Sequence, residues 1–106
     1  MPRVSACVSV LNQPELLKQT LESIQKQTFK DWECIVVDDG SDVSAEPVVT
    51  AMKDARFIFH RFPVNTGIPF GANWAYQHAK GDYIQALGCD EFIYEKKFEQ
   101  QVEYLD

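Results

Sequence analysis

Short apolar segments alternate with segments of helical periodicity along the whole chain. Residues 4–11 (VSACVSVL) are mostly apolar or small, with valine at positions 4, 8 and 10, which is typical of a strand covered on both faces. Residues 32–38 (WECIVVD) predict a second buried strand. Residues 56–62 (RFIFHRF) alternate aromatic and polar-capable positions and predict a third strand, and residues 82–87 predict a fourth.

The segments between these strands predict helices. Apolar residues recur at helical spacing within residues 14–27, where Asn12 is the candidate N-cap. A shorter and weaker pattern covers residues 44–53, and a stripe of small residues predicts a helix over residues 69–80, which Gly81 closes in the usual C-terminal position. The apolar spacing near the end of the chain predicts a last amphipathic helix.

Strand and helix therefore alternate four times, with no internal repeat or linker. Alternating units of this kind build a mainly parallel sheet flanked by helices, so we expect one α/β domain over residues 1–106. Ligands of such sheets bind beyond the carboxyl ends of the strands. The candidate chemistry thus lies in the four loops that follow the strands, at residues 11–13, 38–41, 63–69 and 88–91.

Composition narrows the class of partner. The 16 acidic residues outnumber the 10 lysines and arginines, for a formal net charge of -6, and an acidic domain repels a polyphosphate backbone. We therefore expect no nucleic-acid partner. Cys7, Cys34 and Cys89 are an odd count without CxxC spacing, which favours a reducing compartment. No stretch approaches the roughly 20 apolar residues of a membrane span, and the chain is predicted to be cytoplasmic.

Acidic residues follow two of the predicted strands. Asp38 and Asp39 end the second strand, and Asp90 and Glu91 lie in the turn after the fourth. Carboxylates at two strand ends suit a hard divalent cation. Side chains of this kind also cap helices or lie exposed to solvent in turns. Local chemistry alone therefore leaves both a metal-binding and a purely structural interpretation open. His60 and His78 lie in a predicted strand and a predicted helix without partner spacing for metal binding or catalysis.

Three stretches together resemble the N-terminal half of the family 2 glycosyltransferases. They are the first strand with Asn12, ESIQKQTFKDWECIVVDDGS at residues 22–41, and NTG…AN…A…AKGDYI at residues 65–84. The match is specific, because the QT(F/Y).D(F/W)E strand entry and VVDDGS rarely occur together elsewhere. The resemblance implies the GT-A fold, a Rossmann-like three-layer αβα arrangement. It also implies a nucleoside-diphosphate sugar, with a UDP-sugar favoured, and a divalent metal, Mn²⁺ or Mg²⁺, on the diphosphate.

The resemblance further implies roles for individual residues. Asp39 matches the acid that accepts a hydrogen bond from the uracil N3–H, and Asp38 matches the paired acid that orders the turn. Asp90 matches the last acid of the Asp-x-Asp motif and is the implied metal ligand, with Glu91 as a second carboxylate. A cation there would stabilise the charge that develops on the leaving diphosphate. The implied nucleotide-binding residues are Ser9, Leu11, Asn12, Asp38, Asp39, Gly67 and Asn73.

The sequence departs from the family pattern at three positions. Leu11 replaces an aromatic residue, Ala72 replaces the arginine of the "ARN" element, and Gly88 replaces the first acid of Asp-x-Asp. The family's acceptor site and catalytic carboxylate lie in its C-terminal half, so no residue of this chain is assigned as the catalytic base.

Three hypotheses follow. The leading one is metal-assisted transfer of a sugar from a nucleotide donor to an unknown hydroxyl acceptor, with inversion, by a longer enzyme of which this chain is a fragment inactive on its own. The second is a non-catalytic nucleotide-binding or interaction module on the same scaffold. A receiver-type signalling domain is disfavoured, because such domains carry their acidic pair after the first strand.

Overall fold

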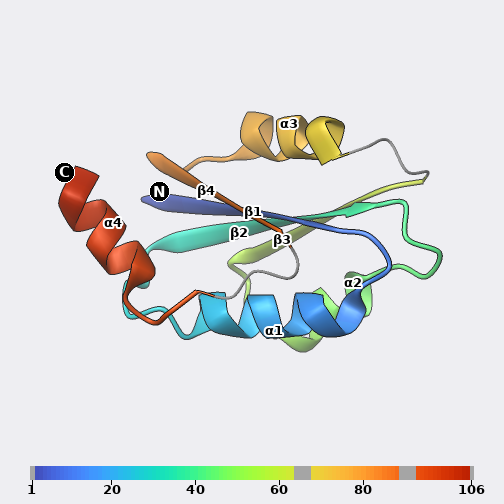
Figure 1. Ribbon diagram of the computed structural model, residues 1–106, viewed down its shortest axis with the longest axis horizontal. Coiled ribbons are helices and arrows are strands. Elements are labelled where there is room, and N and C mark those ends of the chain that lie inside the picture. Colours follow the sequence, from blue (N-terminus) through green and yellow to red (C-terminus); the bar gives the residue numbers. More distant parts are fainter. Residues whose placement is uncertain (1, 64–67, 89–92, 106) are drawn as a thin grey trace.

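The computed structural model describes residues 2–63, 68–88 and 93–105, and within residues 68–72 the backbone alone. Strands and helices alternate as the sequence predicts (Figure 1). The elements are β1 (Val4–Val10), α1 (Pro14–Gln25), β2 (Trp32–Asp39), α2 (Glu46–Ala51), β3 (Phe57–Phe62), α3 (Ile68–His78), β4 (Tyr83–Gly88) and α4 (Lys97–Leu105).

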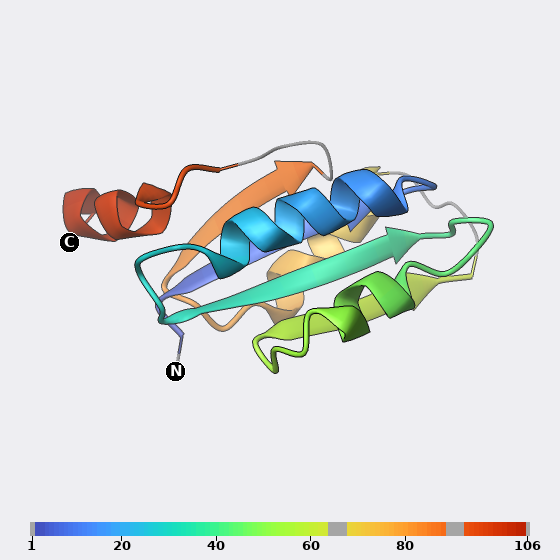
Figure 2. The same ribbon diagram turned by 90° about the horizontal axis from the view of Figure 1, so that it is seen from below.

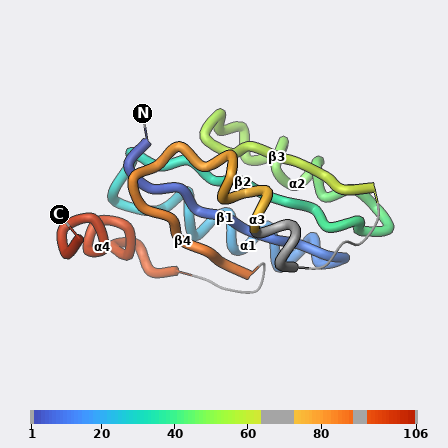
Figure 3. The backbone as a smooth tube through the Cα atoms, turned by 90° about the horizontal axis from the view of Figure 1, so that it is seen from above, coloured from blue at the N-terminus to red at the C-terminus, as the bar shows by residue number. Residues whose placement is uncertain are grey.

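The four strands form one parallel sheet in the order β3-β2-β1-β4. Helices α1 and α2 cover one face of the sheet and α3 covers the other (Figures 1 and 2). Helix α4 lies at the end of the molecule where β1 begins, and Figure 3 shows it beyond β4. The predicted α/β class and three-layer arrangement are confirmed.

Strand β1 is buried on both faces because its side chains alternate between two apolar clusters. Val4, Ala6, Val8 and Val10 pack with α1 and α2, whereas Cys7 packs with Ile35 and Val37 of β2 in the cluster under α3. This two-sided burial explains the nearly continuous apolar run of this strand in the sequence.

Two of the helix-end predictions are wrong. Asn12 is not the N-cap of α1: the cap position is Gln13, and no side chain caps it. Asn12 instead has a φ of 55° and bonds to another loop. Gly81 does not close α3, because that helix already ends at His78. A Cβ at Gly81 would lie 2.7 Å from the backbone N of Ser5, so the glycine is required by its close approach to β1.

Candidate nucleotide-binding edge of the sheet

The carboxyl ends of all four strands meet at one edge of the sheet. In the parallel registers Val10 lies opposite Asp38, Asp38 opposite Arg61, and Ser9 opposite Gly88. The end of each strand is therefore beside the end of its neighbour. This edge brings together the start of the loops in which the sequence places its candidate ligand-binding residues.

Asp38 orders the turn that follows β2. Its carboxylate is fully buried, and its two oxygens accept hydrogen bonds from the backbone N–H groups of Ser41 at 2.9 Å and Ala45 at 2.8 Å. Gly40 has a φ of 78°, a conformation that favours glycine. Both carboxylate oxygens of Asp38 are thus committed within the protein, which agrees with the turn-ordering role expected for this acid.

Asn12 joins the loop after β1 to the loop after β2. Its backbone N–H donates to Oγ of Ser41 at 2.9 Å, and its side-chain Oδ1 accepts a hydrogen bond from the backbone N–H of Asp42 at 2.8 Å. The left-handed φ of Asn12 is one that asparagine tolerates better than most residues. The side chain predicted to line a nucleotide therefore holds the two loops in register with one another.

The remaining predicted residues differ in their accessibility. Asp39, the last residue of β2, is buried, with 4% of its surface exposed. Ser9 is half-buried, and Leu11 is 38% exposed. Asn73 is exposed on α3. The edge thus combines a buried acid with a half-buried serine and with exposed polar and apolar side chains.

Three predicted site residues, Gly67, Asp90 and Glu91, lie outside the described residues. In sequence, Asp90 follows Gly88, the last residue of β4, by two positions. Among residues 2–63, 68–88 and 93–105, no group of three or more His, Cys, Asp or Glu side chains could hold a metal ion. The metal site therefore stays a prediction that rests on the loop after β4.

Arg61 also belongs to this edge, although it is not among the site residues predicted from the sequence. Its Nη2 donates a 2.6 Å hydrogen bond to the carbonyl oxygen of Ser41, and its Nε lies 3.8 Å from Oδ2 of Asp38. The available signal was its position: Arg61 is the penultimate residue of the third strand, and a parallel neighbour places such a residue beside the acids that end the second.

A stack of aromatic rings fixes α3 against β3. The Trp74 ring lies between His60 and His78, with ring centroids 3.9 Å apart on each side. His78 Nδ1 also lies 2.8 Å from the carbonyl oxygen of Trp74. Neither histidine has a partner at metal-binding or catalytic spacing in the sequence, because the ring between them is a tryptophan that the fold brings there.

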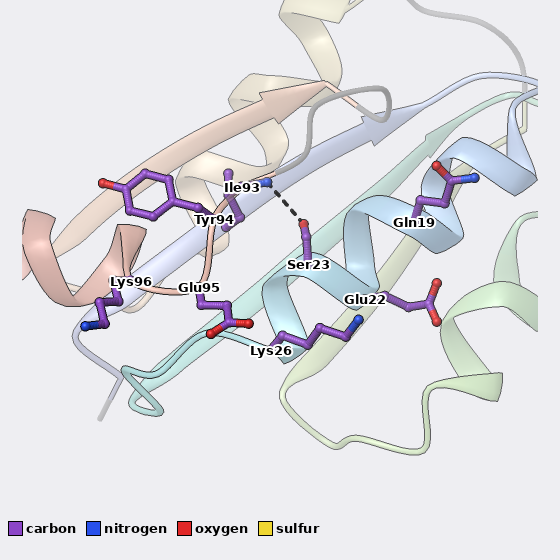
Figure 4. A pocket seen from close by; sticks show the side chains of 8 residues that line it. All are labelled: Gln19, Glu22, Ser23, Lys26, Ile93, Tyr94, Glu95 and Lys96. Atoms are coloured by element: carbon purple, nitrogen blue, oxygen red, sulfur yellow. Dashed lines mark hydrogen bonds between the residues drawn. The ribbon is translucent and has the colours of Figure 1, made fainter.

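A groove of about 730 Å³ lies beside α1. Figure 4 shows its lining side chains, which come from α1 and from residues 93–96, with the backbone N–H of Ile93 donating to Oγ of Ser23 at 3.4 Å. The lining mixes two acids with two lysines: Glu22, Glu95, Lys26 and Lys96. None of the predicted ligand-binding residues that the structure describes lines this groove.

A parallel α/β domain with acidic and polar loops at the carboxyl edge of its sheet has the architecture of the GT-A fold. Solved structures of GT-A proteins match it closely. TarS 1-349 of S. aureus in complex with UDP-GlcNAc superposes with a TM-score of 0.92 at 23% identity, over 98% of this chain and 31% of TarS. The mannosyltransferase PcManGT of Pyrobaculum calidifontis, in complex with GDP-Man and Mn²⁺, gives a TM-score of 0.78 at 24% identity, over 86% of this chain and 28% of its own.

Sequence comparison extends the match from fold to family. Residues 5–106 match the family described as Glycosyl transferase family 2, to which the chain therefore belongs. It is 36% identical over 99% of its length to an uncharacterized glycosyltransferase of Methanocaldococcus jannaschii, and 35% identical over 99% to one of Haemophilus influenzae. The chain spans only 38% and 43% of these relatives. No helix in the described part of the chain is long and apolar enough to cross a membrane.

Proposed function

We propose that this chain binds the nucleotide of a UDP-sugar at the carboxyl edge of its sheet, as the donor-binding part of a longer glycosyltransferase that transfers the sugar to a hydroxyl acceptor with inversion. The supporting observation is the turn that Asp38 orders at the carboxyl end of β2. Asp38 accepts hydrogen bonds from two backbone N–H groups of this turn, and Asp39, the next residue, ends the strand.

Asp39 is the proposed base-recognising residue. A uracil ring presents an N3–H donor, and a carboxylate accepts such a hydrogen bond with the added strength of its charge. The hydrogen bonds of Asn12 with Ser41 and Asp42 join the loop after β1 to the turn after β2, so the turn that follows Asp39 is held in place before a ligand arrives. Preorganisation of this kind reduces the entropy lost on binding.

The ligands in two similar solved structures support a nucleoside diphosphate or its sugar as the ligand class. TarS has been solved with UDP and with UDP-GlcNAc, and PcManGT with GDP-Man and Mn²⁺. For this chain we favour UDP because of Asp39, and we propose Asp90 and Glu91 as the residues that would hold a divalent cation. A bound cation of this type stabilises the negative charge of a leaving diphosphate.

We also propose that this chain is part of a longer protein. The matched relatives are more than twice as long as this chain, which spans 38% and 43% of them. Transfer also needs a base to deprotonate the acceptor hydroxyl, and no residue of this chain is assigned to that role. We therefore propose that this chain supplies donor binding and that residues outside it supply the acceptor site.

Calorimetric titration of the folded chain with UDP in the presence of Mn²⁺ tests the proposal. Wild-type protein should bind UDP in preference to GDP, and Asp39→Asn should weaken UDP binding by about tenfold or more, because a charge-assisted hydrogen bond is lost. Asp31→Asn is the matched control, since Asp31 is exposed and precedes the same strand at the opposite edge. Absence of heat from a folded wild-type sample would contradict the proposal, as would equal UDP affinity for Asp39→Asn.

A further inference from the structure

Arg61 connects β3 to the turn that follows β2. Its guanidinium contacts two points of that turn, the carbonyl oxygen of Ser41 at 2.6 Å and the carboxylate of Asp38 at 3.8 Å. The Asp38 side chain is fully buried, whereas that of Arg61 is 37% exposed. A buried carboxylate needs polar partners to offset the loss of water. Arg61 supplies a cationic partner from the neighbouring strand.

The two contacts enclose the residue proposed to recognise the base. Asp39 and Gly40 lie between Asp38 and Ser41 in sequence, and both of these flanking residues contact Arg61. The backbone N–H of Ser41 also bonds to Asp38, which closes the turn on itself. A shift of the turn would therefore move Asp39, although Arg61 is not the residue that meets the base.

We propose that Arg61 is a positioning residue of the uridine site. It holds the Asp38–Ser41 turn so that Asp39 presents its carboxylate to the uracil N3–H, and this assignment rests on the proposed function of Asp39. Arg61 can hold this turn because the parallel pairing of β2 with β3 places Arg61 opposite Asp38.

The competing role for an arginine at this edge is direct contact with the diphosphate, since a guanidinium matches phosphate geometry well. The two roles predict different effects of an Arg61 substitution on the binding of uridine and of UDP. A positioning residue affects binding of the nucleoside and of the nucleotide alike. A phosphate-binding residue affects UDP and leaves uridine unchanged.

The experiment compares Arg61→Ala, Arg61→Lys and Arg56→Ala by titration with uridine and with UDP. Arg56 is the matched control, because it pairs with Asp54 at the start of the same strand and is similarly exposed, at 33%. Arg61→Ala should weaken uridine and UDP binding by the same factor, about tenfold, which is the typical effect of losing a charge-assisted hydrogen bond. Arg61→Lys should recover part of the loss, because lysine keeps the charge but lacks the fork of donors. Arg56→Ala should bind both ligands like wild type.

Each other outcome overturns the inference. A loss confined to UDP assigns Arg61 to the phosphates, and unchanged binding by folded Arg61→Ala removes its role. If Arg61→Ala does not fold, the uridine and UDP affinities of Arg61→Lys decide by the same criterion.

Hydrogen exchange in the ligand-free chain separates this inference from the proposed function. The amides of Ser41 and Ala45 should exchange faster in Arg61→Ala than in Arg56→Ala, because the turn loses an anchor. Failure of wild type to bind UDP, with this faster exchange, rejects the proposed function and leaves Arg61 as the residue that holds the turn. Unchanged exchange rejects the role of Arg61 itself.

Discussion

Gln27 and Tyr94 are 67 residues apart in sequence, yet Nε2 of Gln27 donates a 2.7 Å hydrogen bond to the carbonyl oxygen of Tyr94. The same amide donates to the carbonyl of Ser23, and its Oε1 accepts from the backbone N–H of Phe98 at 3.0 Å. Next to it, the backbone N–H of Thr28 donates to the carbonyl of Glu95 at 2.8 Å. Gln27 and Thr28, which follow α1, therefore hold the segment that leads into α4 by hydrogen bonds.

Replacing Gln27 with methionine should destabilise the fold strongly. The Gln27 side chain is fully buried, and methionine keeps its approximate shape while leaving the carbonyl of Tyr94 and the N–H of Phe98 without these partners. Loss of these partners, among them the partner of the buried N–H of Phe98, should lower the free energy of unfolding by about 2 kcal/mol. Urea denaturation measures the change. Gln77→Met on the exposed face of α3 is the control, and equal losses in both variants would contradict this role of Gln27.

The fold was largely predictable because its determinants are local and periodic. Continuous apolar runs marked β1 and β2 as strands buried on both faces, and the structure confirms each strand and helix near its predicted place. The errors fall at helix ends. Asn12 and Gly81 were both interpreted from their neighbours in sequence, whereas the contacts that fix them, with Asp42 and Ser5, come from segments distant in the chain.

The site was predictable only as far as resemblance reached. Composition does not separate the roles of Asp38 and Asp39, since both are acids at one strand end; the resemblance separates them, and the structure shows the two backbone hydrogen bonds that Asp38 accepts in the turn. The contact of Arg61 with Asp38 was not predictable from the sequence, because it depends on the register of β2 and β3, which is set by packing across the whole sheet. The nucleotide and metal assignments themselves stay predictions.

Gly81 should not tolerate alanine. A Cβ at this position would lie 2.7 Å from N and Oγ of Ser5 and 2.8 Å from the carbonyl carbon of Val4, and two of these atoms belong to the backbone of β1. Gly81 also donates its N–H to Oγ of Ser5 at 2.8 Å, so the turn cannot retreat without losing that bond. We expect Gly81→Ala to lower the free energy of unfolding by about 2 kcal/mol, typical of overpacking. A thermal melting point equal to that of wild type would refute this.

Asp54 should make the stability of the fold sensitive to acid. Hydrogen bonds from the Arg56 side chain lower the pKa of Asp54 to about 2, against a smaller opposing effect of burial. A carboxyl with a depressed folded-state pKa stabilises the protein above its unfolded pKa of about 4, and this contribution is lost as the pH falls from about 4 to about 2. Allowing for solvent around the partly exposed Arg56, we expect about 1 kcal/mol.

The Asp54 contribution can be isolated by comparing wild type with Asp54→Asn in urea across that pH range. The difference in unfolding free energy between the two proteins should be constant from pH 7 to pH 5 and should shrink below pH 4, because protonated aspartate loses the charge that asparagine already lacks. Asp42→Asn serves as the control, being exposed and close to the opposite edge of the sheet. A difference that stays constant down to pH 2 would show that the pair with Arg56 does not depress the pKa.

Cys7 and Cys34 should be inert thiols in the native protein. Burial, followed by the nearby Glu33 charge, raises the pKa of Cys7 to about 11, and burial raises the pKa of Cys34 well above its ordinary value. Since the thiolate is the reactive form, at pH 8 about one Cys7 in a thousand is ionised, against about a quarter of unfolded cysteines. In a Cys89→Ser chain, iodoacetamide should therefore label the native protein roughly a hundredfold more slowly than the urea-unfolded protein. Mass spectrometry of peptides containing each cysteine measures both rates. Rapid native labelling of Cys34, which is fully buried in the cluster under α1, would mean that this face of the sheet opens far more often than its packing allows.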